Sequence, residues 1–181
     1  MNGNELSIYI QFGSLLYIAT VLFIFLTKKK TRTLENHYFN VISFENMTGL
    51  IMILAYCYIT ANYSLELSTA SLLFKFILAY VTIWILTFTK YVYVISKEIK
   101  YEDEKENPKK WKAKLKFNKI ILILEIIATL IILVLPLDML VSGIDIYANP
   151  ISLSYIFTFV VCISCVIYWF KLISDNNNKK F

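Results

Sequence analysis

Three ionisable residues, Glu45, Lys90 and Glu125, stand inside otherwise apolar stretches of the sequence. A charge near the middle of a membrane-spanning helix costs about 2.5–3.5 kcal/mol even on lenient insertion scales, so such side chains face a bundle interior and pair. Counting ~1.5 Å per residue from the nearest basic segment places all three roughly 10–13 Å into the membrane. We predict an intramembrane polar network in which Lys90 bridges the two carboxylates. The alternative is that each residue is neutral or reaches the surface separately.

The sequence shows no residues arranged for catalysis or for binding a cofactor. It contains one histidine, His37, and four glycines that form no phosphate-binding loop, and it has no cluster of metal ligands. Cys162 and Cys165 have the spacing of a redox motif, but an apolar helix does not lower a thiol pKa as that motif requires. We therefore expect no enzyme activity, no cofactor and no metal site, with these residues serving packing.

Composition and charge distribution indicate an integral membrane protein. Of the 181 residues, 58% are hydrophobic and 17% are charged, whereas ordinary globular chains are roughly 45–50% apolar and about 25% charged. The net charge of +5 does not indicate a nucleic-acid partner, because nearly all positive residues fall in the gaps between apolar runs. Positive residues that gather between apolar runs are typical of the connections between membrane-spanning helices.

Five apolar runs approach or exceed the length needed to cross a hydrocarbon core of ~30 Å. The sequence therefore predicts an all-α, polytopic membrane helix bundle that forms a single domain over residues 1–181. The predicted spans are residues 8–26, 38–59, 72–96, 120–135 and 151–170. Residues 97–119 are predicted as a cytoplasmic loop, and a lipid-sensing surface helix is the alternative for this segment.

The lysines and arginines predict the orientation. Of the 18 positive residues, 16 lie in residues 28–32, 97–119 and 171–180, and the other two, Lys75 and Lys90, lie within the third span. Basic connections are retained on the cytoplasmic face. We predict an outside N-terminus, a cytoplasmic C-terminus and a multi-pass location in the plasma membrane, with the Lys75 ammonium extending to the outer surface.

Several segments resemble a known sensor family. Residues 27–40 (TKKKTRTLENHYFN), followed by TGLI at 48–51, resemble the first cytoplasmic turn and second helix of the multi-pass sensor region of Gram-positive sensor histidine kinases. Residues 84–93 (WILTFTKYVY), the Leu135-Pro136 pair and residues 143–150 (GIDIYANP) are similar to later parts of that region. The phosphoacceptor helix and ATP-binding domain of those kinases have no counterpart in the 181 residues.

The resemblance implies a membrane input module of a two-component-like signalling system that lacks its own kinase domain. Such a chain is a fragment, a truncated relic or a stand-alone module. The outer loop would then sense a peptide or the membrane, with Asp138, Gly143, Asp145 and Tyr147 as candidate residues. The implied partners are the lipid bilayer and a histidine kinase or other membrane protein, with homodimer formation left open and no nucleic acid.

A second class of function stays open. Glu45, Lys90 and Glu125 could line the polar path of a small transporter, a channel or an immunity-type membrane protein. A hydrated cavity that reaches these residues would favour transport, whereas a dry bundle with an outward cleft would favour sensing. A structural scaffold without a ligand is a third possibility.

Overall fold

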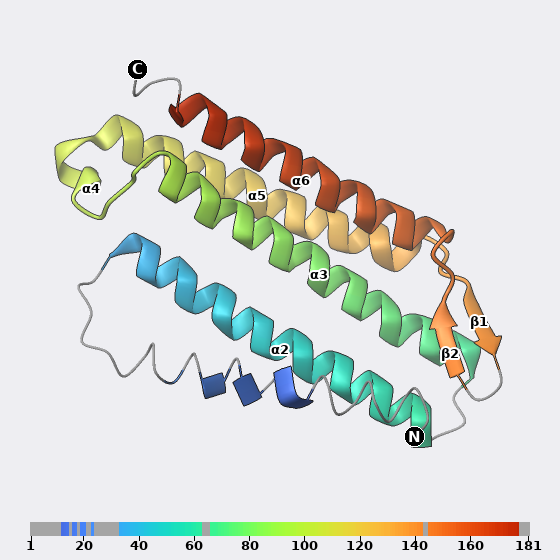
Figure 1. Ribbon diagram of the computed structural model, residues 1–181. Coiled ribbons are helices and arrows are strands. Elements are labelled where there is room, and N and C mark those ends of the chain that lie inside the picture. The colour runs from blue at the N-terminus through green and yellow to red at the C-terminus, as the bar shows by residue number, and fades with distance from the viewer. Residues whose placement is uncertain are drawn as a thin grey trace.

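The computed structural model describes residues 12–14, 16–17, 19–20, 23, 33–62, 66–142 and 145–177. Its elements are α2 (Leu34–Asn62), α3 (Leu67–Ser96), the single turn α4 (Asp103–Glu106), α5 (Pro108–Val134), β1 (Met139–Ser142), β2 (Asp145–Ala148) and α6 (Leu153–Asn177). The four long helices run side by side, and α3 packs against α2, α5 and α6 (Figure 1). The predicted helical bundle is confirmed.

Within the described residues, four helices are long and apolar enough to cross a membrane, namely Leu34–Thr60, Leu67–Ser96, Pro108–Val134 and Leu153–Asn176. They correspond to the predicted spans 38–59, 72–96, 120–135 and 151–170. The predicted span 8–26 lies largely outside the described residues. Large apolar side chains such as Leu130, Val134 and Ile167 are exposed along α5 and α6. So large an apolar surface is unusual for a water-soluble monomer and is what lipid would cover.

Side-chain caps explain where α2 and α5 begin. The Thr33 hydroxyl accepts a hydrogen bond from the Asn36 N–H at 3.2 Å, so α2 starts at Leu34. The Asn107 side chain accepts from the Lys110 N–H, and Pro108 occupies the first turn of α5. Residues 97–119 were predicted to form a cytoplasmic loop. From Pro108 onward they belong to α5, because the cap at Asn107 starts the helix before the basic segment, while the cytoplasmic placement stays a prediction.

The end of α3 is fixed by a Schellman motif in which Glu98 has a φ of 49°. The Ile99 N–H donates to the Val94 carbonyl at 3.0 Å, and the Glu98 N–H donates to the Ile95 carbonyl at 2.9 Å. Val94 and Ile99 also pack with Leu34 of α2. We call this region, which contains the start of α2, the end of α3 and the start of α5, the basic end of the bundle.

The opposite end carries a β-hairpin where the sequence suggested only a loop. β1 and β2 pair antiparallel, with Met139 opposite Ala148. An isolated hairpin is marginally stable, and here Met139 and Ala148 pack against a cluster that includes Leu78, Ala79 and Leu137. The hairpin end is thereby attached to α3.

Lys75 and Ser71 of α3 bind carbonyl groups at and just beyond the C-terminus of α5. The Lys75 ammonium donates to the Leu133 carbonyl at 3.0 Å, and the Ser71 hydroxyl donates to the Leu137 carbonyl at 2.9 Å. The last carbonyls of a helix lack partners within the helix and carry partial negative charge. Lys75 therefore binds the terminus of a neighbouring helix, where we had expected it to extend to the surface.

Ser154 is a fully buried hydroxyl at the same helix end, and replacing it by alanine is expected to destabilise the bundle. Its oxygen lies 2.8 Å from the Leu135 carbonyl and 3.1 Å from the Pro136 carbonyl. Ser154→Ala should cost about 0.6–1.7 kcal/mol, which runs from the average to the largest value measured for hydrogen bonds between membrane helices. Denaturant unfolding in detergent would measure this cost. Ser164→Ala is the matched control, because the hydroxyl of exposed Ser164 donates to the Val160 carbonyl of its own helix. Equal losses in the two variants would refute the assigned role.

Candidate functional site

Lys90 of α3 and Glu125 of α5 form an ion pair inside the bundle. Their nitrogen and oxygen lie 2.7 Å apart, and the two side chains are only 15% and 10% exposed. The Thr87 hydroxyl also lies 3.3 Å from the same Glu125 oxygen. A buried carboxylate needs both charge compensation and hydrogen bonds. α3 supplies the positive charge through Lys90 and the hydrogen bond through Thr87. The ion pair joins two helices that are distant in sequence.

Glu45 belongs to the same polar layer but is bound differently. Its carboxylate, on α2, lies within electrostatic range of Lys90 on α3 and of Glu125 on α5. Among the described residues, however, the ion pairs are Lys90–Glu125 and Lys110–Asp103, so Lys90 forms no ion pair with Glu45. The Glu45 Oε2 atom is buried without a hydrogen-bond partner in the described part of the chain. The structure thus places all three predicted residues in one layer and pairs two of them.

Tyr80 and Gly49 complete the contact between α2 and α3, and sequence reasoning missed both. The Tyr80 hydroxyl donates to the backbone carbonyl of Glu45. The Tyr80 ring lies against Gly49, where an added Cβ would overlap the ring. The one available signal was a glycine in the interior of a predicted span, since small residues let membrane helices approach closely.

A lateral groove of about 450 Å³ opens beside Glu45. Its lining comes from α2 and from one residue of α3, and consists of His37, Asn40, Val41, Phe44, Glu45, Thr48 and Tyr80. Within the described residues, the side-chain oxygen of Asn40 is also buried and unpartnered. The Glu45 carboxylate can accept a proton, and both unpartnered oxygens can accept a hydrogen bond from a ligand. Lys90 and Glu125 do not line this groove.

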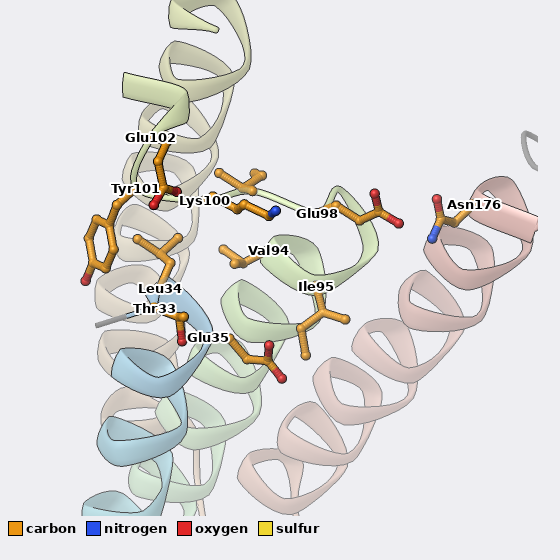
Figure 2. A pocket seen from close by; sticks show the side chains of 11 residues that line it. Thr33, Leu34, Glu35, Val94, Ile95, Glu98, Lys100, Tyr101, Glu102 and Asn176 are labelled. Carbon is orange, nitrogen blue, oxygen red and sulfur yellow. The ribbon is translucent and has the colours of Figure 1, made fainter. Parts of the chain in front are cut away.

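A larger cavity of about 670 Å³ lies at the basic end (Figure 2). Its polar lining comes from three parts of the chain. The charged residues are Glu35 of α2 and Glu98, Lys100 and Glu102 of the segment after α3, and the uncharged Asn176 contributes from α6. This cavity was not predicted, because it depends on how three helix ends meet.

Asp103 holds the turn beside this cavity. Its carboxylate accepts the Lys100 N–H at 2.7 Å and lies 3.2 Å from the Lys110 ammonium. The backbone hydrogen bond, helped by the ammonium, keeps the pKa of Asp103 below its ordinary value of 3.8. The carboxylate is therefore charged at neutral pH, and its contribution to stability is lost only as the pH falls through this lowered pKa.

The candidate sensing residues lie on and around the hairpin. Asp138 is exposed just before β1, and its backbone carbonyl accepts the Asn149 N–H at 2.8 Å. Asp145 and Tyr147 are in β2, where their register partners are Ser142 and Leu140. Gly143 lies outside the described residues. The backbone thus brings three of the four positions to one end of the bundle.

Comparison with protein-family models, with curated proteins and with solved structures finds no match to this chain. Within the described residues, no group of three or more histidine, cysteine or acidic side chains could hold a metal ion. Cys165 is buried on α6 and packs with Ile85, Leu86 and Ile121.

Proposed function

We propose that this chain is a multi-pass protein of the plasma membrane that serves as the input module of a signalling system and has a cytoplasmic basic end. In this proposal a stimulus at the hairpin end displaces α3, and a partner bearing a kinase domain reads the displacement at the basic end. The cytoplasmic location of the basic end is inferred from its lysines and arginines, because basic connections are retained in the cytoplasm.

The connections of α3 are the observation that carries the proposal. This helix contacts both strands and all three other long helices. Lys75 binds the α5 terminus at the hairpin end, and Lys90 binds Glu125 about 22 Å further along α3. Packed interfaces have discrete arrangements, so a shift of α3 at one end changes the contacts at the other. The cavity among the helix ends is where such a change would become accessible to a partner.

Site-directed photo-crosslinking in the native membrane tests this function. A photoreactive phenylalanine analogue replaces Tyr101, which lines the basic-end cavity. The same analogue at Phe170, an exposed position on α6, is the control. We expect an adduct specific to Tyr101 whose partner contains a histidine kinase domain, identified by mass spectrometry. Adducts with lipid alone, or the same adducts at both positions, would contradict the signalling proposal.

Proton or ion transport is the second candidate, and the groove beside Glu45 favours it. A buried carboxylate oxygen without a partner beside a groove is a suitable place for a transported proton. Reconstituted proteoliposomes loaded with a pH-sensitive dye would then acidify faster than empty ones under an imposed potential, and Glu45→Gln would abolish the difference. Glu66→Gln, at the N-cap of α3, is the control. Flux equal to that of empty vesicles would exclude this candidate.

A further inference from the structure

The lysines in the first turns of α5 are divided between two faces of the helix. Lys110 and Lys114 face the bundle. The Lys110 ammonium lies 3.2 Å from Asp103 and 2.5 Å from the Glu98 carbonyl. Lys114 is only 7% exposed, and its ammonium lies 3.9 Å from the centre of the Trp111 ring. These two lysines are therefore used in the contacts that hold the basic end together.

The other four lysines of the segment, Lys109, Lys112, Lys116 and Lys119, are exposed. We call them the lysine stripe. Their spacing of three, four and three residues places them within an arc of about 80° on one face of the helix, over ~15 Å of its length. The ion pairs among the described residues include none of the four. Such a row of like charges repels itself unless an anionic partner compensates it.

The same face continues into the apolar half of α5. At the same spacing, the positions after Lys119 are Ile123, Ile127, Leu130 and Val134, all of them exposed. Because α5 is one uninterrupted helix from Pro108 to Val134, placing this apolar face in hydrocarbon sets the lysine stripe at the level of the lipid headgroups. One face thus offers an acyl-chain surface and, directly beyond it, a row of cations.

We propose that the lysine stripe is a binding site for the headgroups of anionic phospholipids. Each lysine near an anionic leaflet raises the affinity on the order of fivefold. The alignment with the apolar face favours a lipid over a soluble anion, because a lipid fills both halves of the surface at once. The site is independent of the signalling proposal and requires only that α5 spans the membrane.

Native mass spectrometry of the detergent-solubilised protein, titrated with phosphatidylglycerol or phosphatidylcholine, tests the site. The wild type should bind phosphatidylglycerol in preference. Lys109→Gln/Lys112→Gln/Lys116→Gln/Lys119→Gln should lose roughly tenfold or more in that affinity, and the corresponding arginine variant should retain it. Circular dichroism confirms folding, and the double variant Lys112→Gln/Lys116→Gln replaces the quadruple one if the latter unfolds.

The matched control removes four lysines elsewhere, Lys97, Lys100, Lys105 and Lys171, and should change the affinity less than twofold. Equal losses in the two quadruple variants would show that net charge alone attracts the lipid and would overturn the proposal. No preference for phosphatidylglycerol, displacement of the lipid by inorganic phosphate at comparable concentration, or stronger binding of an RNA oligonucleotide to the stripe would overturn it as well.

Discussion

Replacing Lys90 by methionine is expected to destabilise the folded bundle by about 3–5 kcal/mol, because it leaves the Glu125 carboxylate buried without its cation. The pair is close at 2.7 Å, and both side chains are at least 85% covered. Thr87 alone, with its 3.3 Å contact, cannot replace the lost charge. Denaturant unfolding in detergent, followed by circular dichroism, would measure the loss.

Two further variants separate the ion pair from general packing. Lys90→Met/Glu125→Leu should recover most of the lost stability, since removing both charges removes the desolvation cost as well. Lys75→Met should cost less, about 1–2 kcal/mol, because it removes a single hydrogen bond to the Leu133 carbonyl. If Lys75→Met proved as damaging as Lys90→Met, or if the double variant were worse than Lys90→Met, the assigned pairing would be wrong.

The sequence predicted the positions of four helices because hydrophobic length is a strong signal in membrane proteins. The basic segment was predicted to be a loop because it is rich in lysine. The short signal Asn107-Pro108 determines where α5 begins, and lysine is itself a good helix former. The hairpin was missed because its strands have four residues each and gain stability from packing on Leu78 and Ala79, which local sequence does not reveal.

The polar layer was partly predictable because depth along a helix can be counted from its basic end. That count placed Glu45, Lys90 and Glu125 at the same depth, and in the structure Lys90 and Glu125 form an ion pair. Counting does not give the rotation of a helix, so it could not show that Glu125 rather than Glu45 is the partner of Lys90. For the same reason it could not reveal that Tyr80 reaches the Glu45 carbonyl or that Lys75 binds another helix.

Replacing Gly49 by valine is expected to separate α2 from α3. The added Cβ would overlap the Tyr80 ring, and moving the ring would break its hydrogen bond to the Glu45 carbonyl. Overpacking of a tight contact costs about 1–3 kcal/mol, and a β-branched side chain should fall at the upper end. The loss is measured as above, by denaturant unfolding in detergent.

Gly13→Val is the matched control, because an added Cβ at Gly13 meets no described atom within 4 Å. In a Tyr80→Ala background, Gly49→Val should cost far less than in the wild type, since the overlapping ring is gone. A double-mutant cycle therefore isolates the Gly49–Tyr80 contact. Coupling near zero would mean that α2 does not pack on α3 through this contact. Strong coupling would show that the helix bearing Glu45 is held against α3 by a glycine and an aromatic ring.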